Sequence, residues 1–403
     1  MSDERDIGAL PFPQAPEAVE LRHLRSFVAV AEELSYTRAA ERLHLSRPAL
    51  SRQVAALERL VGVQLLQRTT HHVALTFAGE ELLERARSAL GQIDAAIRMT
   101  QSVGGALVGR AAQLWNPIGE QLNDDDDIEA GRRAFESLHA NFSPPDDVGV
   151  RPVSAGGVPG LVASPTGAPP VTTMHLHGGG HVMGSAFGYR HLAGALAVET
   201  GTGVLVPDYR LAPEHPHPAD LDDALTAYRW LLEQGADPSD LLVVGDSSGA
   251  LLALGMLIVL RDHGQPLPGC VALLCPSVDI SWPCPYPSPD LEAAMARLRR
   301  WTAMYLGAHP TDDPVLNPTT ADLTGLPPIL LQACTGDPVL DHAHRLAENA
   351  QACGVETHVE LYPTAIHDFQ IFWALLPEAA DALAHVARFA QRTRAASESS
   401  PRA

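Results

Sequence analysis

Residues 241–264, LLVVGDSSGALLALGMLIVLRDHG, decide the fold of most of the chain. An apolar run typical of a buried strand leads through Gly245, Ser247 and Gly249 directly into an apolar helix. The two glycines allow the strand and the helix to approach each other across a sharp turn, which raises the hydroxyl of Ser247 above the sheet. The pattern predicts a nucleophilic serine at a strand-to-helix turn. The alternative is a glycine-rich turn without chemistry.

Short runs rich in apolar and β-branched residues alternate with amphipathic segments from about residue 146 onward. They read, in chain order, PVTTMHLH, GVLVPDY, LLVVGDS, CVALLCPS, PILLQACTG and THVELYP. This alternation predicts a mostly parallel sheet with helices on both faces. Because such sheets carry their sites at the carboxyl ends of the strands, the polar residues that follow these runs are candidates for chemistry.

Three side chains at these strand ends form a candidate catalytic triad. Asp337 follows the strand ILLQACTG and His367 follows the strand THVELYP, so the chain order is Ser247, Asp337, His367. A serine hydroxyl needs a base to become a nucleophile, and a carboxylate can orient that base. The glycine run at 178–180 and the amide of Ser248 offer donors for the negative oxygen of a tetrahedral intermediate.

The segments around these residues resemble the hormone-sensitive-lipase-like branch of the α/β-hydrolases, which includes acetyl esterases and lactone hydrolases. The matching segments are HLHGGGHVMGS, DYRLAPEHPHPAD, GDSSGA, GDPVLD and YPTAIHDF, and the resemblance covers most of residues 145–390. It implies an α/β-hydrolase fold and a serine carboxylesterase. In that enzyme Ser247 is the nucleophile, His367 is the base and Asp337 orients the base.

The same resemblance implies further features of the site. It assigns the oxyanion hole to the amides of Gly178, Gly179 and Ser248, and it implies a helical cap built from residues 113–145 and roughly 283–308. The chain departs from the family pattern at three positions, which are Ala250, His342 and Asp368. A carboxylate at Asp368 would raise the pKa of the neighbouring base or misplace it, so a ligand-sensing pocket with weak turnover is an open alternative.

The N-terminal part has a different periodicity. The segments VELRHLRSFVAVAEELS, TRAAERLHL and RPALSRQVAALERLVG predict three short helices with a tight connection between the last two. The following VQLLQRTTHHVALT predicts a two-stranded wing, and the segment after Gly79 predicts a long amphipathic helix. The apolar stripe of this helix fits core packing and a dimer contact equally well.

This part resembles the DNA-binding region of LysR-type transcriptional regulators over residues 19–100. The resemblance implies that the third helix enters the major groove of duplex DNA and that the chain forms a homodimer through residues 79–103. The candidate DNA contacts are Ser46, Arg47, Pro48, Ser51, Arg52 and, on the wing, Arg68. Two-fold symmetry would then require a pseudo-palindromic operator. The alternative is a three-helix dimerisation module.

The composition limits the remaining possibilities. The formal net charge of −20 lies entirely in residues 111–403, because residues 1–110 carry equal numbers of arginines and acidic residues. The chain has no lysine, which excludes a lysine Schiff base or a P-loop lysine. The five cysteines show no paired spacing, so we expect reduced thiols, no metal and no cofactor. The absence of a long apolar run and of a basic, apolar leader predicts a cytoplasmic protein without membrane contact.

The sequence thus predicts a multidomain protein, with an all-α winged helix-turn-helix and a long dimerisation helix before an α/β-hydrolase. The predicted parts are a flexible tail at 1–18, a DNA-binding domain at 19–78, a dimerisation helix at 79–103, a hinge at 104–112, a cap segment at 113–145, the hydrolase at 146–395 and a tail at 396–403. The predicted function is a DNA-binding regulator whose hydrolase domain binds and cleaves a small ester or lactone. The alternatives are a carboxylesterase with vestigial DNA binding and a catalytically inactive receptor.

Overall fold

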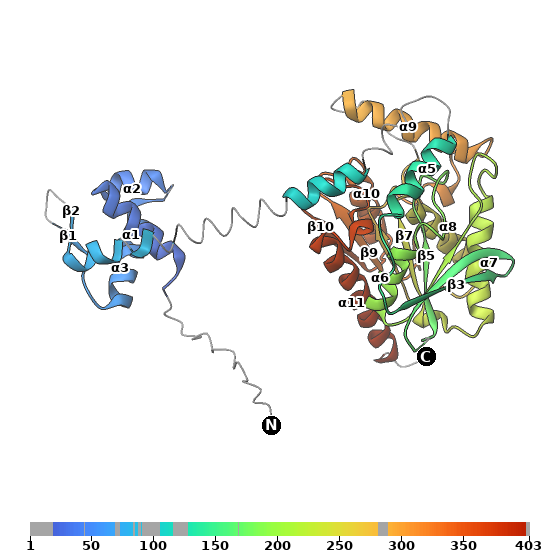
Figure 1. Ribbon diagram of the computed structural model, residues 1–403, viewed down its shortest axis with the longest axis horizontal. Helices are drawn as coiled ribbons and strands as arrows, with labels where there is room; N and C mark the ends of the chain where they lie inside the picture. The colour runs from blue at the N-terminus through green and yellow to red at the C-terminus, as the bar shows by residue number, and fades with distance from the viewer. Residues whose placement is uncertain are drawn as a thin grey trace. The chain divides into compact units, whose positions relative to one another are not determined.

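The computed structural model divides into two compact units, Met1–Gly105 and Ala106–Ala403, each with a hydrophobic core of its own (Figure 1). The structure describes residues 19–43, 45–68, 73–83, 85–87, 90, 105–115, 128–167, 169–280 and 289–399. The predicted tail at 1–18 lies outside these residues. The predicted tail at 396–403 is helical as far as Ser399.

The first unit is the predicted winged helix-turn-helix. Its elements are α1 (Leu21–Glu33), α2 (Tyr36–Arg42), α3 (Arg47–Val61) and the hairpin of β1 (Leu66–Arg68) and β2 (Val73–Leu75). The hydroxyls of Ser35 and Ser46 cap α2 and α3 by accepting from backbone N–H groups, and Gly62 ends α3 in the left-handed conformation. The core holds α1 against α3 through fully buried side chains, among them Phe27, Val30, Leu50, Val54 and Leu57.

The segment after the wing is helical at the described positions among residues 77–90. Residues 91–104 lie outside the described part of the chain, so the dimer contact expected at 79–103 stays a prediction.

The predicted hinge at 104–112 is wrong for most of its length, because residues 105–115 form a helix. The glycines of GGALVG suggested flexibility, but Leu107 and Val108 pack against the hydrolase core and Ala111 is fully buried in it. The division between the two units falls at Gly105. Tertiary packing of the apolar face therefore orders a segment that its glycines alone would leave mobile.

The second unit is built on one eight-stranded sheet in the order β10-β9-β8-β7-β5-β6-β4-β3. The strands are β3 (Val148–Ala155), β4 (Val158–Pro165), β5 (Val171–Leu176), β6 (Gly203–Pro207), β7 (Leu242–Asp246), β8 (Cys270–Leu274), β9 (Ile329–Cys334) and β10 (Thr357–Tyr362). The strands from β5 to β10 are parallel and are the predicted ones. The antiparallel pair β3 and β4 extends the sheet beyond β6 and was not predicted.

Helices cover both faces of this sheet, as predicted (Figure 1). On one face α6 (Arg190–Thr200) packs against α11 (Pro377–Ser399), and on the other α7 (Ala219–Glu233) packs against α8 (Ser248–Asp262). The remaining helices are α5 (Ile128–His139), α9 (Pro289–Leu306) and α10 (Leu340–Ala352), with short 3₁₀ turns η1 (Pro238–Asp240), η2 (Pro314–Leu316) and η3 (Phe369–Phe372). Because α8 packs against the sheet, α7 and η2, nearly all of its side chains are buried.

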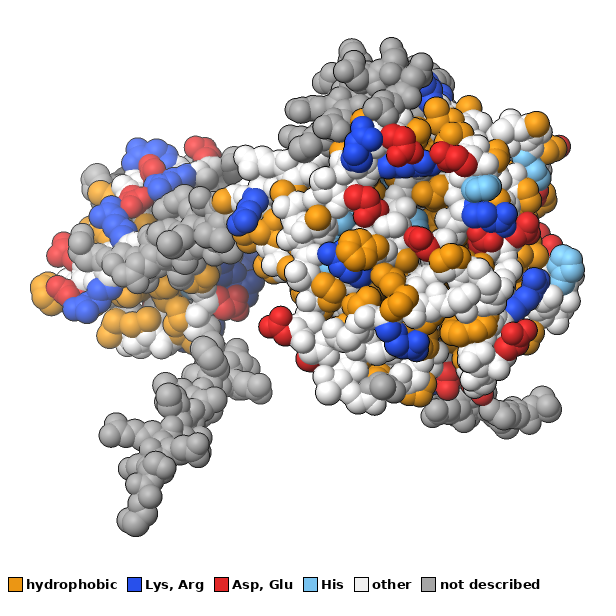
Figure 2. All heavy atoms as spheres, turned by 45° about the vertical axis from the view of Figure 1, so that its right-hand side comes forward, with side chains coloured by type: hydrophobic (Ala, Val, Ile, Leu, Met, Phe, Trp, Pro, Cys, Tyr) orange, Lys and Arg blue, Asp and Glu red, His pale blue; other side chains and the backbone are white. Residues whose placement is uncertain are grey.

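The surface of the hydrolase unit mixes charges of both signs on the face seen in Figure 2. No helix within the described ranges has the length and apolar character needed to span a bilayer.

The close approach of β5 and α8 yields a stability prediction. A Cβ added at Gly249 would lie 2.0 Å from the carbonyl oxygen of Leu176. We expect Gly249→Ala to destabilise the hydrolase unit by about 3 kcal/mol or more, because backbone on both sides has to move to relieve the overlap. Urea unfolding of the full chain measures this. Gly109→Ala is the control, since its Cβ meets nothing within 4 Å; equal stability of the two variants would contradict the packing argument.

Candidate active site

Ser247 lies on the sharp turn between β7 and α8. Its backbone has φ 49° and ψ −117°, a strained conformation for a residue with a side chain. Two backbone hydrogen bonds hold the turn, because Ser247 N donates to Leu274 O at 2.9 Å and Ser277 N donates to Ser247 O at 3.0 Å. The predicted strand-to-helix turn therefore presents the serine at the carboxyl edge of the sheet.

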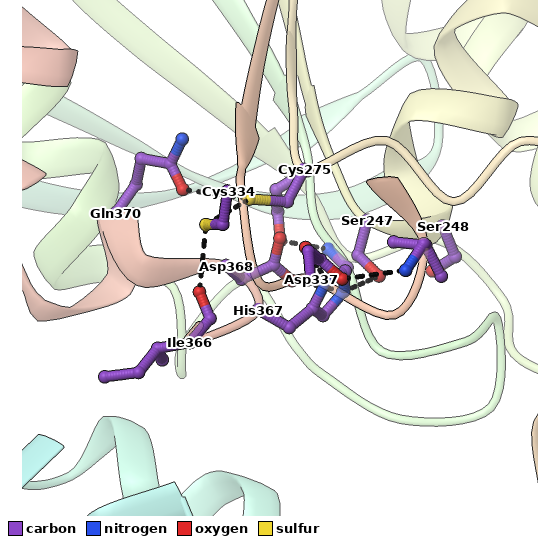
Figure 3. A network of polar contacts seen from close by, with 12 residues as sticks. Ser247, Ser248, Cys275, Cys334, Asp337, Ile366, His367, Asp368 and Gln370 are labelled. Carbon is purple, nitrogen blue, oxygen red and sulfur yellow. Dashed lines mark hydrogen bonds and ion pairs between the residues drawn. The ribbon is translucent and has the colours of Figure 1, made fainter. Parts of the chain in front are cut away.

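The three predicted triad residues meet at this edge (Figure 3). Ser247 Oγ lies 2.8 Å from His367 Nε2, and His367 Nδ1 lies 2.8 Å from Asp337 Oδ2. The other oxygen of Asp337 accepts from Val339 N at 3.0 Å, so both carboxylate oxygens have a donor. The arrangement is a nucleophile, a base within hydrogen-bonding reach and a group that orients the base.

Other histidines near the sheet edge have separate structural partners. His342 Nδ1 accepts a hydrogen bond from Val278 N, and His385 pairs with Glu360. Burial lowers the pKa of His342 to about 4, so it stays neutral at physiological pH. The choice of His367 as the base therefore agrees with the geometry.

The electrostatics of the triad favour a charged imidazole. Burial alone would raise the pKa of Asp337, but the charge and hydrogen bond of His367 hold that pKa below its usual range. Burial alone would lower the pKa of His367, but the carboxylates of Asp337 and Asp368 outweigh it and raise the pKa to about 10. The two carboxylates therefore favour the protonated form of the His367 imidazole.

Asp368 is the second acidic neighbour of the base. Its Oδ2 lies 3.5 Å from His367 Nε2, on the nitrogen that faces Ser247, and its side chain is only 3% exposed. Its backbone is left-handed, with φ 52°, and its Oδ1 has no hydrogen-bond partner in the described part of the chain. Burial raises the pKa of Asp368 well above its usual range. The carboxyl group thus changes the charge around the base without displacing it from Ser247.

The glycine run supplies a correction to the predicted oxyanion hole. Gly178 N donates to Asp246 Oδ2 at 2.9 Å, so this amide is already used within the protein. The amides of Gly179 and Gly180 make no hydrogen bond to another residue that the structure describes. Ser248 is the first residue of α8, where an N–H has no acceptor within the helix. The structure therefore argues against Gly178 as a donor, and Gly180, which was not among the predicted residues, has an amide without an acceptor among the described residues.

Two tryptophans border the site and were not among the predicted residues. Trp115, from the helix at 105–115, contacts the ring of His367 edge-on at 6.4 Å between centroids. Trp301, from α9, lies so close to Gly180 that a Cβ there would approach its ring to 2.7 Å. Both lie within the predicted cap segments, 113–145 and roughly 283–308. The sequence pattern did not show which side chains of these segments would face the triad.

Two thiols lie near the triad, as Figure 3 shows. Cys275 and Cys334 are buried, their sulfurs are 3.6 Å apart, and Cys334 Sγ donates to Ile366 O. Burial raises the pKa of Cys275 well above its usual range, so this thiol is a packing group rather than a nucleophile. The described cysteines are all free.

The predicted DNA contacts gather at the start of α3. Ser46, Arg47, Pro48 and Arg52 are exposed there and Ser51 is half-buried. Arg68 is the last residue of β1, and its side chain lies outside the described part of the structure. An exposed arginine pair at the N-terminal half of the third helix is the arrangement with which a helix-turn-helix meets DNA.

Comparison with known proteins identifies both units. A family model for the alpha/beta hydrolase fold matches residues 173–371, and a model for the bacterial regulatory helix-turn-helix proteins of the lysR family matches residues 21–80. An acetyl-hydrolase of Streptomyces hygroscopicus is 35% identical over 62% of this chain and 86% of its own length. The chain belongs to the α/β-hydrolase family. It carries a lysR-family helix-turn-helix at its N-terminus.

Further relatives place the hydrolase within one branch of that family. An esterase of Acinetobacter venetianus is 34% identical over 64% of this chain and 87% of its own length. The crystal structure of an esterase from the bacterial hormone-sensitive lipase family aligns with a TM-score of 0.66 and 32% identity, covering 72% of this chain and 98% of that one. The predicted resemblance and fold class are confirmed, and the relatives support the predicted enzyme class, a carboxylic ester hydrolase.

The position of Asp368 predicts a shifted pH profile. A general base works only when neutral, so kcat/KM should rise with pH until it passes the pKa of His367. We expect Asp368→Asn to move this rise to lower pH, because the charge that favours the imidazolium is removed while the left-handed turn is tolerated. Initial rates on p-nitrophenyl acetate against pH, corrected for spontaneous hydrolysis, measure it. The control is Asp262→Asn at an exposed site. An unchanged pH profile would show that the charge of Asp368 does not raise the pKa of His367.

Proposed function

We propose that the hydrolase cleaves a small carboxylic ester or lactone through an acyl-enzyme on Ser247, and that it regulates transcription by binding duplex DNA as a homodimer. The observation that carries the enzymatic part is the 2.8 Å contact between Ser247 Oγ and His367 Nε2, continued at 2.8 Å to Asp337. The observation that carries the DNA-binding part is the exposed start of α3 in a lysR-family unit.

The proposed reaction proceeds in two stages. His367 Nε2 takes the proton of Ser247 as the hydroxyl oxygen attacks the ester carbonyl carbon, and Asp337 stabilises the imidazolium. The C–O bond to the leaving group then breaks, and His367 returns its proton to the departing alkoxide. A water molecule, deprotonated by the same imidazole, attacks the acyl-enzyme, and the released carboxylic acid leaves Ser247 protonated for another cycle.

The oxyanion hole of this reaction consists, in our proposal, of the amides of Gly179, Gly180 and Ser248. The first two have no acceptor within the described residues, and the third begins α8, whose partial positive end favours an anion. Gly178 has a supporting role, because its hydrogen bond to Asp246 fixes the start of the loop beneath these amides.

The substrate in this proposal has a short acyl group. Trp115 borders His367 and Trp301 borders the glycine loop, so we expect their rings to restrict the space open to the acyl group. An acetyl-hydrolase is among the relatives that match the chain over most of their own length. A small, uncharged ester or lactone suits an aromatic-walled site of this kind.

A second candidate function is a ligand receptor that turns over slowly. The buried carboxyl of Asp368 beside the base favours the protonated, inactive form of His367. In this case the pocket would hold its ester long enough to report it to the DNA-binding unit. Both candidates place the protein in the cytoplasm, where its DNA lies.

The enzymatic part is tested by Ser247→Ala. We expect the rate on p-nitrophenyl acetate to fall by at least about 10³-fold, because no other group can form the acyl-enzyme. The unfolding midpoint of the variant serves as the control for folding. Equal rates for the variant and the wild type would exclude Ser247 as the nucleophile, and a wild-type rate no higher than the buffer background would favour the receptor.

The DNA-binding part is tested by Arg52→Ala. The probe is a labelled duplex that carries the intergenic DNA next to the gene, titrated at several salt concentrations. We expect weaker binding and a salt dependence reduced by about one unit of slope, because one phosphate or base contact is lost. Arg59→Ala, at the other end of α3, is the matched control. Unchanged affinity and slope in Arg52→Ala would contradict the proposed docking of α3.

A further inference from the structure

A second group of histidines lies outside the triad, between the segment that follows β6 and the segment that follows α9. His217 belongs to the first segment, and His309 and Asp313 belong to the second. None of these three residues is among the predicted site residues. The cysteine spacing, on which the expectation of no metal was based, does not bear on a site made of histidines and a carboxylate.

The three side chains converge. His309 Nε2 lies 2.8 Å from Asp313 Oδ2, and the rings of His217 and His309 are 4.6 Å apart at an interplanar angle of 79°. One ligand atom from each of the three residues lies within 4.8 Å of the other two. Two imidazole nitrogens and one carboxylate oxygen at such separations can be bridged by one ion with bonds of about 2.0–2.2 Å after small rotations.

The surroundings of His217 prepare it as a ligand. Its Nδ1 lies 3.0 Å from the hydroxyl of Tyr305 and 3.7 Å from Asp220 Oδ1, so Nε2 is the nitrogen left to bind. Histidines that bind metals characteristically hold their second nitrogen in this way, with a carboxylate or another oxygen as acceptor. Asp220 is itself held by His181 Nδ1 at 3.0 Å, which makes the support rigid.

The carboxylate of Asp313 is also oriented. Its Oδ1 accepts from Val315 N at 2.9 Å as the cap of η2, which leaves Oδ2 to face His309. The side chain of His217 is 2% exposed, whereas those of His309 and Asp313 are 26% and 28% exposed. The site therefore has a buried floor and a side open to solvent through which an ion can enter.

We propose that His217, His309 and Asp313 bind a divalent transition-metal ion, with Zn²⁺ as the ion that best suits two imidazoles and one carboxylate. Three protein ligands leave a further coordination position for water. Magnesium is disfavoured because it prefers oxygen ligands. The inference is independent of the proposed function, since none of the three residues belongs to the triad.

The ion would link the segment that follows α9 to the segment between β6 and α7. His217 N already donates to Tyr305 O at 2.8 Å, near the end of α9, and the ring of Tyr305 stacks on His181 at 3.7 Å. His181 directly follows the glycine run of the oxyanion loop. A metal at this position would thus stabilise the anchorage of α9, which carries Trp301 to the edge of the active site.

The test is metal binding by the tag-free full chain. Titration calorimetry with zinc sulfate should show one ion per chain, and Co²⁺ should give the visible absorption of a site with nitrogen ligands. We expect His309→Ala and Asp313→Asn to weaken Zn²⁺ binding by at least about 10-fold. Zn²⁺ should also raise the melting temperature of the wild type and not that of the variants. Both variants change partly exposed side chains and leave the buried His217 in place. We therefore expect both variants to fold.

The matched control is His358→Ala. This residue forms a comparable exposed pair with Glu356 at 2.9 Å, and no third ligand joins it in the metal-compatible groups of the described residues. The Zn²⁺ affinity of the His358→Ala variant should equal that of the wild type. Absence of stoichiometric binding in the wild type, or equal affinities for the wild type and His309→Ala, would overturn the proposal and leave His309 and Asp313 as a simple hydrogen-bonded pair.

Discussion

The carboxylate of Asp246 connects the parts on which the active site depends. It is 1% exposed and accepts from three donors: His175 at 2.7 Å, Gly178 at 2.9 Å and Tyr189 at 2.8 Å. Because Asp246 precedes the nucleophile, these bonds fix the turn of Ser247 and the start of the glycine loop in one frame. A buried donor that loses its acceptor costs about 1–3 kcal/mol, so the three bonds hold together as a set. A single side chain therefore links the turn of Ser247 to the start of the glycine loop.

The second constraint is the crowding of acidic groups around the base. His367 has Asp337 on one nitrogen and Asp368 near the other, and two buried carboxyl groups cannot both hold a full negative charge there at low cost. Burial accordingly raises the pKa of Asp368 well above its usual range, whereas the charge and hydrogen bond of His367 hold the pKa of Asp337 low. A substrate that fills the site and excludes water changes the same balance, because it alters the solvation of every charge in the group.

The sequence predicted the parts of the fold that are coded locally. The strands from β6 to β9 are mostly apolar and fully buried, and the turn at Ser247 has its glycines at fixed spacing. By contrast, β3 and β4 include prolines and glycines and are partly exposed, so no apolar run marks them. Likewise, the engagement of Gly178 depends on Asp246, 68 residues away, which local patterns do not encode. The packing that orders residues 105–115 is tertiary for the same reason.

The same distinction applies to the candidate sites. The triad was recoverable because each member follows a strand that the sequence reveals, whereas Trp115 and Trp301 reach the site from outside the sheet. The group of His217, His309 and Asp313 could not be found in the sequence, because His217 lies about 90 residues before the other two. Only the folded chain brings the three side chains together.

The helix at 105–115 has a consequence for substitutions in the hydrolase unit. It begins at the boundary between the two units, and near its other end the indole of Trp115 lies edge-on to the ring of His367. A change of the side chain at Trp115 therefore alters both the surroundings of His367 and the packing of the segment with which the hydrolase unit begins.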